Sequence, residues 1–153
     1  MKALSLYPEW AMQIMLGYKT VECRSWPTKY RGYLLICASS KPWPLTIDSH
    51  AISIAKLIDV ALFTEAHLEE ACMEEMPPAG SYAWIFEPRH IWIEPFPVKG
   101  RQRLFDVDDS LIQVLPDDVP EATCLREYYE PLMNFGKNGE AREIWEEIIH
   151  DFS

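Results

Sequence analysis

GYKTVECRSWPTKYRGYLLICAS, residues 17–39, is the stretch that decides the fold of this chain. Polar and apolar side chains alternate over 20–25, which predicts a short strand with one polar face. Pro27 ends that strand, and Gly32 opens a second one. The second segment, 33–39, is apolar almost throughout, as is typical of a strand in the centre of a sheet. We therefore expect two neighbouring strands, one of which presents charged side chains.

The polar face of the first strand carries three side chains suited to recognition. Thr20, Glu22 and Arg24 point the same way, with about 7 Å between successive positions, and Lys19 precedes them. An arginine offers planar donors that fit a phosphate or a base edge. A carboxylate accepts hydrogen bonds from an exocyclic amine such as cytosine N4. This set suits a cleft that binds one nucleobase and a phosphate.

A purely structural role is the alternative for the same residues. Glu22 and Arg24 would then form an ion pair that closes the sheet, and Trp26 would belong to the core. Taken singly, Trp26 and Trp84 favour a place in the core. Taken together, Lys19, Glu22 and Arg24 favour a site.

Aromatic and basic residues outside this strand extend the candidate site. Trp26, Trp10 and Tyr7 are suited to stack on a flipped or single-stranded base. Lys99 lies in a proline-braced loop beside two arginines. It is either an ordinary loop lysine or a cation at the mouth of the cleft that binds a phosphate, and the sequence leaves both interpretations open.

Further strands and two helices are expected in the first two thirds of the chain. Pro8 suits the first turn of a helix that ends just before Gly17. Thr64 is a good N-cap for a short exposed helix over 64–76, which contains five glutamates. The remaining strands are predicted at 3–7, 51–63, 81–87 and 89–96, with a last short strand at the end of the loop 95–107.

The charge distribution divides the chain into two parts. Residues 106–153 hold 13 acidic and three basic side chains, which accounts for the net charge of −10, whereas residues 1–105 hold 11 of each. We expect a barrel domain over 1–107 and an acidic, mostly helical extension over 108–153, packed on the barrel or appended to it. Its last helix, over 139–152, is amphipathic. The apolar face of that helix comprises Ile144, Trp145, Ile148, Ile149 and Phe152. The extension is either a solvated surface or a binding site for a protein partner.

The order of the predicted elements indicates an α+β fold. It is expected to be a small, mostly antiparallel β-barrel with peripheral helices and a C-terminal helical extension. With 153 residues, the chain is long enough for one domain with its own core. No apolar run approaches the roughly 20 residues that a membrane-spanning helix needs, and the N-terminus lacks the pattern of a signal peptide. We therefore expect a cytoplasmic protein that makes no use of a membrane.

Familiar catalytic and ligand-binding motifs are missing from the sequence. It contains no G-x-x-x-x-G-K-[ST] or G-x-G-x-x-G loop for nucleotide phosphates and no G-x-S-x-G serine motif. The four histidines (His50, His67, His90 and His150) and the four cysteines lack metal-ligand spacing, so we expect no metal, no cofactor and no disulfide framework. Cys37, within the apolar strand, is expected to be buried.

Three blocks in the order SLYPEWA (5–11), GYKTVECRSWP (17–27) and YRGYLLICAS (30–39) resemble the ASCH domain, a family named for a homology to the activating signal cointegrator. The core of the resemblance is the motif G-x-K-T-x-E-x-R. IAKLIDV, GSYAWIF and PFPVKGRQRLF look like the remaining strands of the family, in the expected order. The resemblance covers roughly residues 3–107 and leaves the acidic extension outside.

The resemblance implies a PUA-like β-barrel, a fold shared with RNA-modification modules. It also implies a ligand cleft between the K-T-x-E-x-R segment and the barrel. Family members are proposed to bind RNA or modified nucleobases, some small relatives hydrolyse N4-acetylcytidine, and others are reported as ribonucleases or bind DNA. The first hypothesis is therefore a module that binds RNA, single-stranded nucleic acid or a modified nucleoside through the residues of the motif.

A hydrolase acting on N4-acylated cytidine or on RNA is the alternative. In the acetylcytidine-hydrolysing relatives the segment reads K-T-x-T, with the lysine as base, the second threonine as nucleophile and a downstream glutamate assisting. Lys19 and Thr20 match this pattern, whereas Glu22 replaces the second threonine and cannot attack as an alkoxide does. The downstream acid would fall within 65–75. A ribonuclease would use Lys19 and Glu22 as base and acid, with Arg24 stabilising charge.

Overall fold

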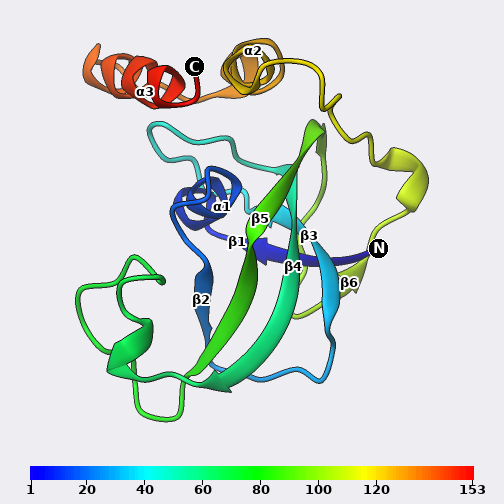
Figure 1. Cartoon of the computed structure of the whole chain (residues 1–153), viewed down its shortest axis with the longest axis vertical. Helices are drawn as coiled ribbons and strands as arrows, with labels where there is room; N and C mark the ends of the chain where they lie inside the picture. The colour runs from blue at the N-terminus through cyan, green and yellow to red at the C-terminus, as the bar shows by residue number, and fades with distance from the viewer.

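The computed structural model describes residues 1–89 and 91–153, together with the backbone of His90. Within these residues, one mixed sheet has the strand order β2-β5-β4-β3-β1-β6 and curls into a half-barrel (Figure 1). Its strands are β1 (Lys2–Leu6), β2 (Val21–Arg24), β3 (Gly32–Ala38), β4 (His50–Leu62), β5 (Tyr82–Pro97) and β6 (Phe105–Asp106). The predicted α+β fold, a mostly antiparallel barrel-like sheet with peripheral helices, is confirmed.

One parallel pair lies within this otherwise antiparallel sheet. β1 runs parallel to β3, with Ala3 opposite Leu35 and Leu6 opposite Ala38. The connection between them contains α1 (Pro8–Met15), as a parallel crossover requires. β3 is covered on both faces, which explains why its sequence is apolar almost throughout. Cys37, in this strand, is fully buried as predicted, and burial raises the pKa of its thiol to about 12.

β5 is a single long strand, so the prediction of two separate strands at 81–87 and 89–96 is wrong. Pro88 lacks an N–H group and cannot donate to a sheet ladder. The sheet accommodates it with an irregular register between β4 and β5. Between the pairs Ile54–Ile91 and Leu57–Phe86, β5 contains four residues and β4 only two. The extra residues bulge out, and the strand continues beyond them.

Helix α1 packs its apolar side against the concave face of the sheet. Pro8 occupies the first turn, where its missing N–H group costs nothing. Ala11, Ile14 and Met15 are at most 2% exposed. Burial of an aliphatic side chain of this size contributes roughly 1.5–3 kcal/mol. The helix is therefore held firmly, and so is the chain that leaves its C-terminal end toward β2.

The segment between β4 and β5 does not form the helix predicted over 64–76. It contains one 3₁₀ turn, η1 (Glu65–His67), which Thr64 caps, and then a series of tight turns. Cys72 adopts the left-handed conformation with φ of 56°, which a continuing helix does not tolerate. Backbone hydrogen bonds to β2 hold the segment instead, because the N–H groups of Thr20 and Val21 both donate to the carbonyl of Glu70. These tertiary contacts override the local helical preference.

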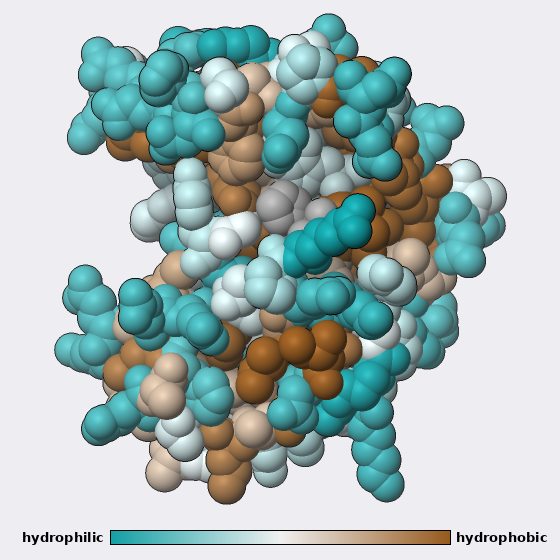
Figure 2. Space-filling model, viewed as in Figure 1, coloured by the Kyte–Doolittle hydropathy of each residue, from teal (hydrophilic) through white to brown (hydrophobic). Residues whose placement is uncertain are grey.

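The extension after β6 packs on the same core as the barrel. It contains η2 (Asp109–Leu111), α2 (Glu121–Cys124), the π-helical turn η3 (Leu125–Tyr129), η4 (Glu130–Leu132) and α3 (Glu140–Asp151). Trp145 and Ile149 of α3 are buried as predicted, whereas Ile144 is 41% exposed. The predicted apolar face is therefore too wide by that residue. Hydrophilic side chains dominate the outer surface over α2 and α3, at the top of Figure 2. The division at residue 107 and a protein partner for the extension stay predictions.

Tyr129 links this extension to the sheet through hydrogen bonds. Its hydroxyl accepts from the N–H of Ile93 at 3.1 Å and lies 2.9 and 2.8 Å from the carbonyl oxygens of Ile52 and Ile93, which share its single hydrogen. These two isoleucines lie where the β4–β5 register shifts, between Ala51 and Ser53. A side chain from the extension therefore hydrogen-bonds to the backbone at the point where the β4–β5 register shifts.

The described residues contain neither a membrane-spanning helix nor a cluster of metal ligands. None of the helices in this part of the chain is long and apolar enough to cross a membrane. The same residues contain no group of three or more His, Cys, Asp and Glu side chains that could hold a metal ion. The side chain of His90, one of the four histidines considered above, lies outside the described residues. All four cysteines are free thiols.

Candidate functional site

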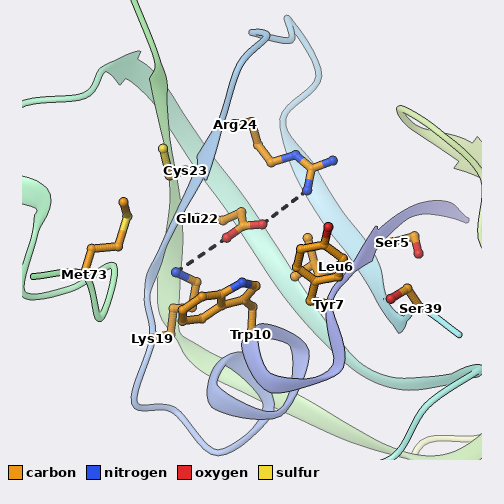
Figure 3. A pocket seen from close by; sticks show the side chains of 10 residues that line it. All are labelled: Ser5, Leu6, Tyr7, Trp10, Lys19, Glu22, Cys23, Arg24, Ser39 and Met73. Carbon is orange, nitrogen blue, oxygen red and sulfur yellow. Dashed lines mark hydrogen bonds and ion pairs between the residues drawn. The ribbon is translucent and has the colours of Figure 1, made fainter. Parts of the chain in front are cut away.

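A cavity of about 480 Å³ opens beside the polar face of β2 (Figure 3). β1 and the start of α1 form one wall, and β2 with the chain just before it forms the opposite wall. Of the residues predicted for a site, Trp10, Lys19, Glu22 and Arg24 all line this cavity. The structure thus brings together side chains from three elements that are separate in the sequence.

The turn after α1 places Lys19 in the cavity wall. Gly17 adopts the left-handed conformation with φ of 85°, which costs a glycine little. The N–H of Gly17 donates to the carbonyl of Ile14 at 3.1 Å, and the N–H of Tyr18 donates to that of Gln13 at 2.9 Å. This pair of bonds is the Schellman motif that ends many helices. The N–H of Lys19 also donates to Gln13, at 3.1 Å, so the turn fixes the lysine backbone directly before β2.

Lys19, Glu22 and Arg24 form a chain of ion pairs along the cavity wall. The two oxygens of Glu22 face different partners, with Oε1 3.5 Å from Lys19 Nζ and Oε2 3.3 Å from Arg24 Nη1. The side chains of Lys19 and Glu22 are 2% and 7% exposed, whereas that of Arg24 is 23% exposed. In Figure 3 the glutamate lies between the two cations. The ion pair proposed from the sequence is therefore present, and it lines an open cavity.

Lys19 also makes two contacts outside the ion pairs. Its ammonium donates to the carbonyl of Ala71 at 2.6 Å and lies 4.9 Å from the centre of the Trp10 ring. The backbone of the 63–81 segment therefore helps to hold the lysine. The thiol of Cys23 lies beside these groups. Burial raises its pKa, and the negative charge of Glu22 raises it further by a smaller amount. These contacts make the wall rigid and preorganised.

Two aromatic residues form the opposite side of the cavity. Trp10 is half-buried, whereas Tyr7 is 49% exposed and lies at the rim. The ammonium of Lys41 lies 4.9 Å from the centre of the Tyr7 ring. Aromatic faces opposite hydrogen-bonding groups are the usual components of a site for an unpaired base.

Trp26 and Thr20 take different places from these residues, and neither is among the described residues that line the cavity. Trp26 packs edge-to-face on the buried Trp84, with ring centres 4.7 Å apart, and its carbonyl accepts from the indole N–H of Trp84 at 3.0 Å. The ring also contacts two guanidinium groups, those of Arg24 and Arg103, at 5.7 and 5.1 Å from its centre. Trp26 therefore joins the core to the charged surface.

Lys99 lies at an adjoining cavity of about 760 Å³. The acidic cluster at 65–75 contributes backbone groups and Met73 to the site, but its five glutamates are exposed and do not line the cavity in the described part of the chain. Ser5 and Ser39, which line both cavities, are absent from the sequence prediction. No local pattern distinguishes them, because only the parallel pairing of β1 and β3 brings their segments together.

Comparisons with known proteins agree with the fold. The family model of the ASCH domain matches residues 4–104. Among solved structures, a serine-to-alanine variant of the ASCH protein from Zymomonas mobilis has a TM-score of 0.59 at 20% sequence identity, over 73% of this chain and 96% of that one. The unsubstituted Zymomonas mobilis protein has a TM-score of 0.56 at 21% identity, over 71% and 88%. No match was found among curated protein sequences. The structural likeness covers the barrel fold.

Proposed function

This chain belongs to the ASCH domain family, and from that premise we propose that its cavity binds a single unpaired nucleobase of RNA. The observation that carries the proposal is the ion-paired cluster of Lys19, Glu22 and Arg24, which lines an open cavity together with Trp10. Its volume of about 480 Å³ falls in the range of sites for small ligands.

Each wall of the cavity has a distinct part in this proposal. Trp10 and Tyr7 provide flat surfaces on which a base stacks, an interaction that contributes roughly 1–3 kcal/mol per base and tolerates different sequences. Glu22 accepts a hydrogen bond from an exocyclic amine, because two carboxylate oxygens have about four acceptor positions and the two cations leave some of them free. A base with an amino group, cytosine or adenine, fits this wall best.

Arg24 provides the directional donors. Its guanidinium has five N–H groups, and the contact with Glu22 through Nη1 leaves most of them available. Trp26 supports the guanidinium from behind at 5.7 Å, which keeps its plane in place. The arginine is therefore prepared to bind a base edge or a phosphate at the mouth of the cavity.

The geometry supports binding better than the hydrolase alternative. Both polar contacts of Lys19, with the carbonyl of Ala71 and with Glu22, use the ammonium as a donor, whereas a general base must accept a proton. Thr20 does not line the cavity in the described part of the chain, and Glu22 replaces the nucleophilic threonine of the acetylcytidine-hydrolysing pattern. Hydrolysis of N4-acetylcytidine or RNA stays an alternative that product analysis would reveal.

A binding measurement with three variants tests the proposal. A fluorescently labelled single-stranded RNA of about ten nucleotides is titrated with the protein at low salt, and fluorescence anisotropy is recorded. Trp10→Ala and Arg24→Ala should each weaken binding at least fivefold, from the lower limit of stacking and from the loss of a charged donor. Lys137→Ala, an exposed lysine of the extension, is the matched control and should bind as the wild type does. Absence of binding by the wild type at low salt would refute the proposal, because low salt favours phosphate contacts.

A further inference from the structure

A second cavity adjoins the first and shares a wall with it. It holds about 760 Å³ and lies between the loop after β5 and the ends of β1 and β3. Ser5, Arg24 and Ser39 line both cavities. A ligand that enters the first cavity with one group can therefore place the neighbouring group in the second, past the guanidinium of Arg24.

The walls of the two cavities are cationic although the chain is strongly acidic. Four cationic side chains line them, namely Lys19, Arg24, Lys99 and Arg101, against one carboxylate, Glu22. The net charge of the whole chain is −10. A local positive potential in a concave surface attracts anions even when the protein repels them elsewhere. The distribution thus selects an anionic group specifically at this place.

The second cavity is the more positive of the two. Lys99 and Arg101 are exposed, and all of its described lining residues other than these two and Arg24 are uncharged. One carboxylate lies behind the wall, because the hydroxyl of Ser49, a lining residue, donates to Asp48 at 2.8 Å. Arg24 is paired with Glu22 in the first cavity, so Lys99 and Arg101 carry the remaining positive charge of the second cavity, which exceeds the single negative charge of Asp48. Phosphate is the anionic group of a nucleic acid, and arginine binds it with paired donors.

Three details indicate that the shared wall is shaped for a polar ligand. Gly100 lies so close to β1 that a Cβ atom at this position would collide with the side chain of Ser5, so only a glycine lets the loop approach. The hydroxyl of Ser39 is shielded from solvent and has no hydrogen-bond partner among the described residues, although buried polar groups usually have one. The Trp26 ring contacts the guanidinium groups of both Arg24 and Arg103, at 5.7 and 5.1 Å from its centre.

We propose that the second cavity binds the phosphate next to the base, so that the ligand is a phosphate-bearing nucleotide and free nucleosides are discriminated against. This inference rests on the proposed function, since it assumes that the base occupies the first cavity. It adds the class of ligand, because a site for free modified nucleosides would not need the cations of the loop after β5. It also assigns Lys99 and Arg101 as phosphate-binding residues.

Isothermal titration calorimetry with a graded set of ligands tests this inference. The ligands are cytidine, cytidine 5′-monophosphate, cytidine 3′-monophosphate and a five-nucleotide single-stranded RNA of the same base, together with the corresponding adenine series. The proteins are the wild type, the Lys99→Gln/Arg101→Gln variant and the Lys137→Gln/Arg142→Gln variant. The last is a matched control, because it removes one lysine and one arginine that are exposed on the extension.

The expected result separates the two cavities. Wild type should bind at least one nucleotide or the RNA ten or more times more tightly than the nucleoside. The Lys99→Gln/Arg101→Gln variant should lose at least tenfold in affinity for that ligand while its affinity for the nucleoside stays within twofold. The salt dependence for RNA should decrease by about 1.4 in log–log slope, from about 0.7 per lost phosphate contact on a single strand. The control variant should match the wild type.

Each other outcome overturns a defined part of the reasoning. Equal affinity for nucleoside and nucleotides would reject the phosphate cavity and leave the proposed base site intact. Unchanged binding by the Lys99→Gln/Arg101→Gln variant would reject these two residues as the phosphate contacts. Binding of none of the ligands at low salt would reject the proposed function itself. Tighter binding of a mononucleotide than of the RNA would limit the ligand class to free nucleotides.

Discussion

Replacement of Glu22 by glutamine should reveal how strongly the ion-pair chain of the cavity wall is coupled. Glu22→Gln preserves the shape of the side chain and one acceptor oxygen but removes the negative charge between Lys19 and Arg24. Because Lys19 is only 2% exposed, its ammonium would stay buried with the carbonyl of Ala71 as its remaining close partner. A buried charge that loses its counter-ion is among the most destabilising changes known in proteins.

The magnitude follows from the burial of the three side chains. Loss of one partner from a buried pair costs about 3–5 kcal/mol. The lower end applies here, because Arg24 is 23% exposed and keeps part of its hydration, and the glutamine oxygen still accepts a hydrogen bond. We expect Glu22→Gln to lower the free energy of unfolding by about 3 kcal/mol.

A second substitution separates the charge from other effects. Lys19→Met in the Glu22→Gln background removes the stranded ammonium, so the double variant should be more stable than Glu22→Gln alone by 1 kcal/mol or more, on the order of the coupling found between contacting residues. Ala71 loses its hydrogen-bond donor in this variant, which costs roughly 1 kcal/mol and prevents a full return to wild-type stability.

Urea unfolding at pH 7, followed by tryptophan fluorescence, measures these differences. Glu74→Gln, a change at an exposed glutamate of the 63–81 segment, serves as the control and should stay within about 0.5 kcal/mol of wild type. If Glu22→Gln is as stable as this control, the pairs contribute no net stability. If the double variant is no more stable than Glu22→Gln alone, the stranded Lys19 ammonium is not the cause of the loss and the prediction is refuted.

Three further predictions concern the hydrogen bonds of Tyr129 and the close approach of Gly100 to Ser5. Tyr129→Phe should lower the free energy of unfolding by about 2–3 kcal/mol in urea, because it leaves the buried N–H of Ile93 without its partner; a loss below 0.5 kcal/mol would show that the sheet can satisfy this group by itself. Burial raises the pKa of Tyr129 above its ordinary value, so the hydroxyl stays protonated in the folded chain while the unfolded chain ionises. Stability should therefore fall as pH rises above about 10, by up to about 1.4 kcal/mol per pH unit, and Tyr129→Phe should remove that part of the slope. Gly100→Ala should destabilise the protein by about 1 kcal/mol through overpacking, and by less in a Ser5→Ala background, where the nearest atom is missing; equal thermal shifts in both backgrounds would contradict the close approach.

The barrel strands other than β5 could be predicted because their determinants are local. The alternation over 20–25, the apolar run of 33–39 and the Pro8 and Gly17 boundaries all describe what the adjacent backbone does. The predictions that were wrong depend on distant partners. The 64–76 segment has a helical sequence pattern, but the hydrogen bonds from β2 to the carbonyl of Glu70 impose a different path.

The candidate site shows the same division. One short motif contains Lys19, Glu22 and Arg24, so these residues could be chosen from the sequence. Trp10 could be chosen as an aromatic residue suited to base stacking in the helix just before that motif. The second cavity could not be outlined, because its walls join the ends of β1 and β3 to a loop some sixty residues later. Lys99 was left between two interpretations for that reason. Because Lys99 lines the second cavity, we assign it as a phosphate-binding residue.

The hydrogen bonds of Tyr129 also bear on the order in which the molecule is completed during synthesis. Domains generally begin to fold from the N-terminal side while the ribosome is still extending the chain. β4 and β5 emerge first, yet the group that satisfies Ile52 and Ile93 is built more than thirty residues after the second of them. We expect the pairing of β4 and β5 to be less stable at that point, and accessible to proteases and chaperones, until residue 129 has left the ribosomal tunnel. The acidic extension then stabilises the barrel as the last step of folding. Chains whose synthesis stops before it should be more sensitive to proteases than the full chain.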